Sequence, residues 1–220
     1  MKQGGLFSTD TARRLMRLAV LPAALAILAA TGLCASAASL STAALKSGDI
    51  AIVLDGDIAD GDGDAVEALM KETNDRGKLV AALRLDSLGG SLAESVKIAE
   101  LVQRTKIAVV VGARAHCASA CFLIFAAGTE KFVAYGAAIG VHGASDKYGR
   151  ITPRAAAATV SMARMVREFG VPPGIVEKLI VTGPDEIVWL SIDELRSMGA
   201  VISGRPRASL PVVTEEPASG

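Results

Sequence analysis

Strand-like apolar segments alternate with helical patterns along this chain, and the alternation limits the possible fold more than any other feature. The segments DIAIVLDGDI, KLVAALRL and KIAVVVGA, at residues 49–58, 78–85 and 106–113, are predicted strands. Their apolar residues run almost continuously, which is typical of strands covered on both faces. We therefore predict an α/β fold with a mostly parallel sheet covered by helices.

Helical patterns separate and follow these strands. In residues 63–77, Val66, Leu69 and Met70 share one face, with Asp64 placed to cap the start and a glycine at the end. A chain of 220 residues, 51% of them hydrophobic, is long enough to bury a sizeable core in one domain. Further helices are predicted over residues 91–105, 119–128, 153–169 and 173–181, and extended segments over residues 131–136 and 137–143.

The first 37 residues have the pattern of a secretory signal peptide. Three arginines precede the apolar run at residues 18–33, and Ala-Ser-Ala at residues 35–37 matches a small-residue cleavage site. We therefore predict export to a periplasmic or other extracytoplasmic location. The alternative is an uncleaved membrane anchor, because residues 18–38 hold no charge and could span a bilayer as a helix.

Composition divides the rest of the chain into three parts. We predict a Ser/Ala-rich linker at residues 38–48, one domain at residues 49–204, and a disordered tail at residues 205–220 that is rich in Pro, Ser and charge. Lys and Arg total 23, as do Asp and Glu, and the part after the signal is slightly acidic. A nucleic-acid surface needs excess positive charge, so we exclude nucleic acid as a partner. A membrane is a partner only if the N-terminal segment stays attached.

The stretch ARAHCASACFLIFAAG places Cys117 and Cys121 on either side of Ser119. If Cys34 is removed with the signal, these two form an even pair in an exported protein, which favours a disulfide. On one helix their Cα atoms would lie about 6 Å apart, and the bond forms more easily if Cys117 precedes the helix. The alternative is two small buried thiols.

With His116, the cysteines lack the paired spacing of a zinc site, so we predict no metal and no cofactor.

Two loops are candidates for chemistry because each ends a strand and opens a helix: DSLGGS at residues 86–91 and AHCASA at residues 115–120. At such strand ends, helix N-termini present unpaired N–H groups to developing negative charge. Ser119 has the placement of a nucleophile elbow, but it needs a base to accept its proton. Of the two histidines, we interpret His116 as a local hydrogen-bonding residue, and His142 as either a core histidine or a general base.

Three segments in order resemble motifs of the proteolytic subunit of the Clp protease, whose fold is shared by crotonase-like enzymes and signal-peptide peptidases. DSLGG at residues 86–90 resembles an Asn-Ser-Pro-Gly-Gly loop. ASACFLIFAAG at residues 118–128 resembles an Ala-Ser turn that opens a helix, and GVH at residues 140–142 resembles a Met-Ile-His segment. The resemblance covers roughly residues 49–202 and implies repeated β-β-α units.

The resemblance implies a serine peptidase that cleaves peptides or unfolded proteins through an acyl-enzyme. With the signal sequence, we predict that it is exported and therefore ATP-independent. Ser119 resembles the nucleophile and His142 the base. An N–H group of Gly89 or Gly90, together with that of Ala120, would form the oxyanion hole. Each such donor stabilises an oxyanion by about 3 to 4 kcal/mol, and glycine lets the backbone approach a substrate closely.

The resemblance fails at the acid of the catalytic triad. The family places an Asp four residues before a Ser or Thr that leads to the last helix, but Ile187 stands four residues before Ser191 in the matching segment. Asp185 is our preferred acid and Glu186 the second choice, each through a shift of the loop. The alternative interpretation is that residues 184–186 form only a turn.

Two other functions stay open at this point. A serine–lysine peptidase, as among the signal-peptide peptidases, would use Lys178 as the base. A non-catalytic module would bind peptides without the acid. Acyl-CoA chemistry is disfavoured because an exported protein does not meet CoA.

A homo-oligomer is implied by the rings that family members build. Residues 146–170 resemble the family's contact arm, and this segment carries an apolar helical face. If exposed, that face would need a partner. Its members are Ala158, Met162, Met165 and Phe169.

Overall fold

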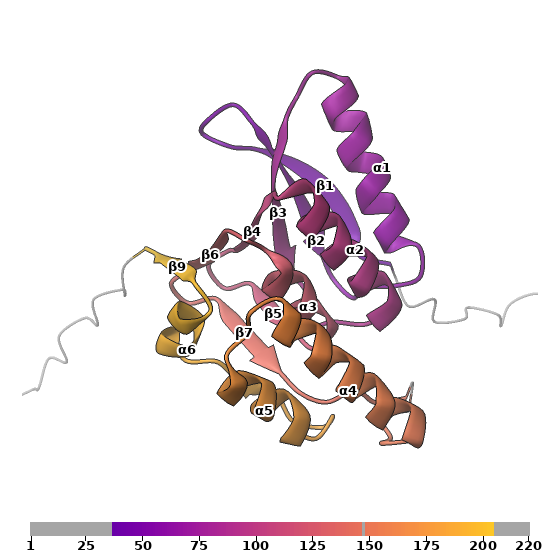
Figure 1. Ribbon diagram of the computed structural model, residues 1–220. Helices are drawn as coiled ribbons and strands as arrows, with labels where there is room; N and C mark the ends of the chain where they lie inside the picture. The colour runs from indigo at the N-terminus through magenta and orange to yellow at the C-terminus, as the bar shows by residue number, and fades with distance from the viewer. Residues whose placement is uncertain (1–36, 147, 205–220) are drawn as a thin grey trace, which may run out of the picture. The chain divides into compact units, whose positions relative to one another are not determined.

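The structure is a computed structural model that describes residues 37–146 and 148–204 (Figure 1). Except for Ala37 and Ala38, the predicted signal peptide, its cleavage site and the alternative anchor lie outside the described residues, and so does the C-terminal tail. No helix in the described part of the chain is long and apolar enough to cross a membrane.

The larger sheet has six strands in the order β1-β2-β3-β4-β6-β9, and every neighbouring pair is parallel except β1 and β2. Its central strands are apolar on both faces, as expected for a parallel sheet covered by helices. The α/β prediction is therefore confirmed. The strands are β1 (Ser39–Ala44), β2 (Ile50–Asp55), β3 (Val80–Asp86), β4 (Ala108–Val111), β6 (Lys131–Ala134) and β9 (Ala200–Ser203).

A second sheet of three short strands carries the candidate catalytic segments. β5 (His116–Ala118) pairs in parallel with β7 (Ala138–Val141), and β7 pairs in antiparallel fashion with β8 (Val188–Trp189). A parallel bridge between Ser87 and Cys117 links the loop after β3 to β5. The carboxyl ends of β3, β5 and β7 are thereby held next to one another.

Six helices in the described part of the chain accompany the sheets, and α3 is the most deeply buried. All of its residues are buried, which explains why its sequence is apolar on every face. It lies between α2 and α4 and also contacts β4, β5 and β7 (Figure 1). The helices are α1 (Asp62–Asp75), α2 (Leu92–Thr105), α3 (Ala120–Ala127), α4 (Pro153–Glu168), α5 (Pro173–Val181) and α6 (Ile192–Ser197).

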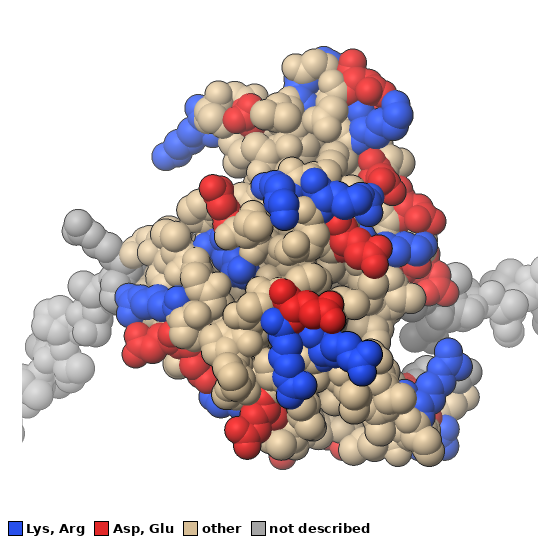
Figure 2. Space-filling model, viewed as in Figure 1, with Lys and Arg blue, Asp and Glu red and all other residues tan. Residues whose placement is uncertain are grey.

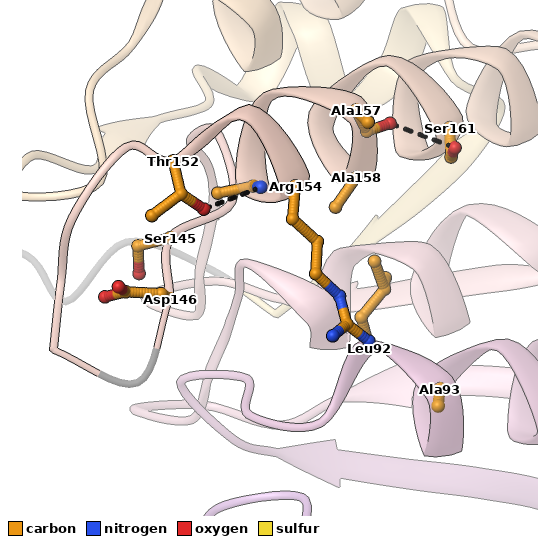
Figure 3. Close-up of a pocket in the computed structure, with 10 residues that line it drawn as sticks. Leu92, Ala93, Ser145, Asp146, Thr152, Arg154, Ala157, Ala158 and Ser161 are labelled. Atoms are coloured by element: carbon orange, nitrogen blue, oxygen red, sulfur yellow. Dashed lines mark hydrogen bonds between the residues drawn. The ribbon is translucent and has the colours of Figure 1, made fainter.

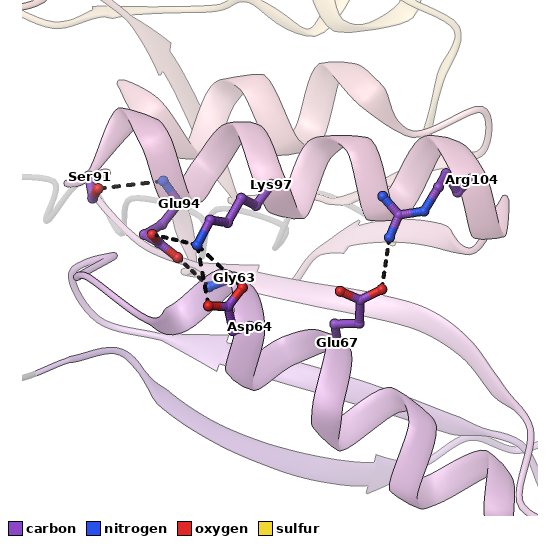
Figure 4. A network of polar contacts seen from close by, with 7 residues as sticks. All are labelled: Gly63, Asp64, Glu67, Ser91, Glu94, Lys97 and Arg104. Carbon is purple, nitrogen blue, oxygen red and sulfur yellow. Dashed lines mark hydrogen bonds and ion pairs between the residues drawn. The ribbon is translucent and has the colours of Figure 1, made fainter.

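A network of polar contacts fixes the start of α2 against α1 (Figure 4). The buried Glu94 carboxylate accepts the Gly63 N–H at 2.9 Å and pairs with Lys97, which also reaches Asp64 at 3.3 Å. The hydrogen bond from Gly63, assisted by Lys97, lowers the pKa of Glu94 below its ordinary value. Ser91 caps the helix by accepting the Glu94 N–H. The network therefore anchors the chain directly after Gly90.

The charges on the face that includes this network are mixed. Figure 2 shows lysine and arginine side chains interspersed with aspartate and glutamate, without a continuous basic surface on the visible face. Two of the contacts are exposed ion pairs between α1 and α2, which solvent and salt screen. These pairs are Lys97 with Asp64 and Arg104 with Glu67.

Two sequence expectations are corrected by the structure, and the condition attached to a third is not met. Residues 38–48 are not a linker, because β1 pairs with β2 over six residues and extends the sheet. Asp64 does not cap α1, which begins at Asp62 after Gly61. The apolar face of α4 is not exposed: Met162 is buried, and Met165 and Phe169 pack against the chain's own core.

Candidate active site

Ser119 joins β5 to α3 in a backbone conformation that serine rarely adopts. Its φ of 55° and ψ of −125° lie outside the ordinary strand and helix regions. Such a conformation costs about 1 to 3 kcal/mol and persists only where the surroundings enforce it. It is the sharp strand-to-helix turn of a nucleophile elbow, which presents the serine hydroxyl at the end of a strand.

A disulfide between Cys117 and Cys121 encloses this turn. Cys117 belongs to β5 and Cys121 to the first turn of α3, and their Cα atoms lie 5.3 Å apart. Both cysteines are fully buried, whereas Ser119 is partly accessible. The bond therefore closes a short loop around Ser119.

Gly89 lies directly against Ser119. A Cβ atom added to Gly89 would meet the Ser119 Cβ at 2.7 Å and the Ala120 nitrogen at 3.0 Å, and the φ of Gly89 is +112°. A Cβ on Gly90 would lie 2.2 Å from the carbonyl oxygen of Ile58. Only glycine fits at either position, so the two glycines bring the backbone of one loop onto the turn that holds the serine.

The hydrogen bonds of this loop distinguish the two glycines. The Gly89 N–H donates to Ser87 Oγ at 3.1 Å. The N–H groups of Gly90 and of Ala120, the first residue of α3, have no hydrogen-bond partner within the described residues. Two unpaired donors therefore lie beside Ser119.

The loop is held to β5 by three further hydrogen bonds. Asp86 Oδ1 accepts the His116 N–H at 2.9 Å, Ser87 N–H donates to the His116 carbonyl at 2.7 Å, and Ala118 N–H donates to the Ser87 carbonyl at 3.1 Å. The His116 ring is exposed and packs edge-on against Trp189, with ring centroids 5.9 Å apart. Asp86 and His116 thus contribute to the position of the loop.

His142 follows the end of β7 on the strand beside Ser119. The β5–β7 register pairs Ala118 with Gly140, so the two candidate residues leave adjacent parallel strands at the same edge. His142 Nδ1 lies 2.7 Å from the Gly143 carbonyl oxygen. Because a carbonyl only accepts, this contact assigns the proton to Nδ1 and leaves Nε2 as the acceptor. Ser119 Oγ and His142 are not hydrogen-bonded in this structure.

The position opposite His142 is occupied by Ile187. The antiparallel β7–β8 register pairs Gly140 with Trp189 and Val141 with Val188, and its continuation places Ile187 opposite His142. The Ile187 side chain lies over Gly140, where a Cβ would meet Ile187 Cγ2 at 2.4 Å. The side chain next to the histidine is therefore aliphatic.

The two acids and the lysine expected from the sequence lie elsewhere. Asp185 and Glu186 are exposed in the turn before β8, and neither carboxylate is hydrogen-bonded to His142. Lys178 Nζ donates to Glu194 Oε1 at 2.5 Å, and this bond, with one from the Ser191 N–H, lowers the pKa of Glu194. The geometry therefore does not bring Asp185 to the histidine, and Lys178 is bound to a carboxylate.

Comparisons with known proteins found similarity at the level of structure. No family model and no curated protein matches the sequence. ClpP1 from Listeria monocytogenes is similar with a TM-score of 0.53 and 18% identity over 70% of this chain and 92% of that one. A variant of the 1510-N membrane-bound stomatin-specific protease is similar with a TM-score of 0.51 and 21% identity over 70% and 77%. Another variant of that protease, in complex with a substrate peptide, gives 0.52 and 21% over 71% and 74%.

The chain has the ClpP-like fold. The shared architecture is the mostly parallel sheet with its covering helices. The identities, below 25%, carry the fold alone, so the chemistry of the site depends on the residues described above.

A cavity of about 640 Å³ opens beside the candidate site, between the start of α2 and the start of α4 (Figure 3). Its walls come from segments that directly follow the candidate catalytic loops: α2 begins two residues after Gly90, and Ser145 lies three residues after His142. The lining residues are Leu92, Ala93, Ser145, Asp146, Thr152, Arg154, Ala155, Ala157, Ala158 and Ser161.

Sequence reasoning missed three contributors to the site. The Ser87 hydroxyl binds the Gly89 N–H, the Gly143 carbonyl orients His142, and Arg154 lines the cavity. The roles of Ser87 and Gly143 depend on backbone geometry, which no local sequence pattern shows. Arg154 lies 35 positions after Ser119, so no local pattern connects it to the site. Nor is there a group of three or more His, Cys, Asp or Glu side chains that could hold a metal ion within residues 37–146 and 148–204.

Proposed function

We propose that this chain is a serine peptidase that cleaves peptides or unfolded proteins through an acyl-enzyme at Ser119. The observation that carries the proposal is the conformation of Ser119, which is held in a nucleophile elbow with Gly89 packed against it. A serine in an ordinary turn needs neither a disulfide around it nor a glycine loop on top of it. The neighbouring protease structures support the same class of reaction.

In the proposed acylation step, Ser119 Oγ attacks the scissile carbonyl carbon and His142 Nε2 accepts the hydroxyl proton. The carbonyl oxygen becomes an oxyanion, which the N–H groups of Gly90 and Ala120 stabilise. The Gly89 N–H is already bound to Ser87 Oγ, so Gly90 is the better candidate of the pair. His142 then returns the proton to the leaving amine, and the C–N bond breaks.

In the proposed deacylation step, His142 accepts a proton from water, and the water oxygen attacks the acyl carbon. The bond between the acyl carbon and Ser119 Oγ then breaks, His142 returns the proton to Oγ, and the carboxylic acid product leaves. The Gly143 carbonyl keeps the imidazole in the correct tautomer, as the acid does in a complete triad. A neutral carbonyl stabilises imidazolium less than a carboxylate does, so a slow peptidase is expected.

The proposal includes export and a peptide substrate. The pattern in the first 37 residues supports delivery outside the cytoplasm, where no ATP is available to an unfoldase. Substrates are then short peptides or chains that are already unfolded. The similar 1510-N protease, whose structure contains a substrate peptide, supports this substrate class, and ClpP-like relatives support a homo-oligomer.

A non-catalytic peptide-binding module is the second candidate function. The observation that favours it is Ile187, which occupies the place opposite His142 where a triad would have its acid. A serine–lysine mechanism has less support, because Lys178 is bound to Glu194.

A fluorophosphonate probe on the full-length protein tests these functions, since it labels only an activated serine. We expect labelling of the wild type, none in Ser119→Ala, and a rate reduced at least a hundredfold in His142→Ala. Lys178→Met should label at the wild-type rate. A wild type that is folded but never labelled would establish the binding module, and loss of labelling in Lys178→Met alone would establish the lysine mechanism.

A further inference from the structure

The cavity beside the proposed active site contains one cation on an otherwise largely apolar wall. Leu92 and Ala93 line one side, and the alanines of α4 line the other. In Figure 3, the Arg154 side chain extends from α4 across the cavity, and its guanidinium group lies beside Leu92. Arg154 forms no hydrogen bond or ion pair within the described residues. An unpaired guanidinium beside apolar surface is a ready partner for a carboxylate.

The one acidic residue of the cavity wall is already neutralised. Asp146 Oδ2 accepts from Arg150 Nε at 2.9 Å, and Asp146 Oδ1 accepts the N–H groups of Tyr148 and Arg150 at 2.8 and 3.0 Å. On the α2 side, Glu94 is bound to Gly63 and Lys97. Arg154 is therefore the cavity residue whose charge remains available to a ligand.

The cavity lies within reach of the reacting atoms. Consecutive Cα atoms are about 3.8 Å apart, so Leu92 is at most about 8 Å from Gly90 and Ser145 at most about 11 Å from His142. A peptide in extended conformation advances about 3.3 Å per residue. A side chain one to three residues from the scissile bond is therefore close enough to enter the cavity.

We propose that this cavity is a substrate subsite that receives a carboxylate of the bound peptide, and that Arg154 determines the preference for it. The apolar wall accommodates the methylene groups of a Glu or Asp side chain, and the guanidinium pairs with the carboxylate. The C-terminal carboxylate of a short peptide has the same chemistry and is the second source. The role of the cavity as a substrate subsite rests on the proposed function. The binding of a carboxylate peptide to the cavity does not.

Binding is measured first, by fluorescence anisotropy on the full-length Ser119→Ala protein, so that the result does not depend on catalysis. Three labelled peptides of one sequence separate the sources: Glu with an amidated C-terminus, Gln with an amidated C-terminus, and Gln with a free C-terminus. We expect a carboxylate peptide to bind roughly tenfold more tightly than the amidated Gln peptide, with the advantage decreasing at high salt. Tighter binding of the Glu peptide identifies a side-chain subsite, and tighter binding of the free C-terminus identifies a terminal one.

Arg154→Gln should abolish this preference, Arg154→Lys should retain part of it, and Arg154→Glu should favour a peptide with Lys at the varied position. Arg164→Gln is the matched control, because Arg164 is exposed on the same helix and does not line the cavity. Equal binding of all three peptides, or a preference that survives in Arg154→Gln, would overturn the proposal.

Turnover of the same peptides by the wild type then separates the two proposals. If the fluorophosphonate labels Ser119 but kcat/KM shows no preference for a carboxylate, the subsite is wrong and the peptidase stands. If the carboxylate peptide binds selectively and no labelling occurs, the subsite stands and the peptidase is wrong.

Discussion

The two halves of the proposed active site are held in place by very different means. On the serine side, a disulfide, a fully buried helix and a loop tied by hydrogen bonds to β5 all constrain Ser119. On the histidine side, His142 is oriented by the carbonyl of its own neighbour, Gly143, and faces an aliphatic Ile187. The serine half is fixed more firmly than the histidine half.

The difference follows from the free-energy cost of each arrangement. A positive φ at a serine costs about 1 to 3 kcal/mol and is lost unless the surroundings enforce it. His142 has no such cost to offset, because it sits at the end of an ordinary strand and needs only the correct ring orientation. The contrast predicts that changes on the serine side reduce activity strongly, while the histidine side can still be improved.

The largest effect is expected from Gly89→Ala. The added methyl group would lie 2.7 Å from the Ser119 Cβ and 3.0 Å from the Ala120 nitrogen, and alanine disfavours the φ of +112°. The loop must shift and displace the Gly90 N–H from its place beside the Ala120 N–H, so we expect kcat/KM to fall by roughly 10² to 10³. Steady-state hydrolysis of a fluorogenic peptide measures the loss.

Gly77→Ala is the control for this substitution. Gly77 also has a positive φ, of +76°, but a Cβ there would meet no atom within 4 Å. It should lower stability by about 1 kcal/mol and leave kcat/KM unchanged. If Gly89→Ala loses no more activity than Gly77→Ala, the close approach of the glycine loop to Ser119 has no role in catalysis.

Much of this fold is predictable from the sequence because its central strands and helices differ clearly in pattern. The strands that became β2, β3 and β4, and all helices from α1 to α5, follow from apolar runs and helical spacing. The sequence of β1, SLSTAA, consists mainly of small and polar residues and therefore has the pattern of a linker, and its strand forms through pairing with β2. The strands β5 and β8 have three and two residues, too few for any period to appear.

The site is less predictable, and the reason lies in long-range geometry. Ser119, the glycine pair and His142 were identified from motifs, and β5 and β7 bring the serine and histidine segments side by side. The choice of Asp185, with Glu186 second, is not supported, because the β7–β8 register places Ile187 opposite His142 and no sequence pattern shows that register. Arg154 lines the cavity because the start of α4 lies across it from the start of α2, and the sequence does not show this arrangement.

An intermediate effect is expected from removing the disulfide. In Cys117→Ser with Cys121→Ser, the cross-link that closes the nucleophile turn is lost, and the unfolded chain gains entropy worth about 2 kcal/mol for so short a loop. We expect a lower Tm and a kcat reduced roughly tenfold with little change in KM, because Ser119 occupies its reactive conformation for less of the time. Thermal unfolding and steady-state kinetics measure the two effects.

A purely structural role for the disulfide would give a different result. The kcat of the double variant is measured well below its lowered Tm. If it equals the wild-type kcat, packing of α3 alone maintains the turn. A reductant should reproduce the variant's kcat in the wild type and leave the variant itself unaffected. This comparison separates the loss of the bond from the change of the two side chains.

The smallest effect, and the one that addresses the histidine side directly, is a gain. Ile187→Asp places a carboxylate opposite His142, where it can accept from Nδ1 and stabilise the protonated ring. We expect kcat/KM to rise about threefold. The acid limb of the pH–rate profile should move to higher pH, because the ring now holds its proton more firmly and must lose it to act as a base.

Ile187→Asn separates charge from shape. Asn has nearly the same size as the Asp of Ile187→Asp, and both substitutions remove the aliphatic contact over Gly140. It should not raise kcat/KM, and its acid limb should stay where the wild type has it. The gain from Ile187→Asp should also vanish in a His142→Ala background. A gain that persists there, or one that Asn reproduces, would mean that Ile187 affects the site through packing and that the histidine side is already as well ordered as the serine side.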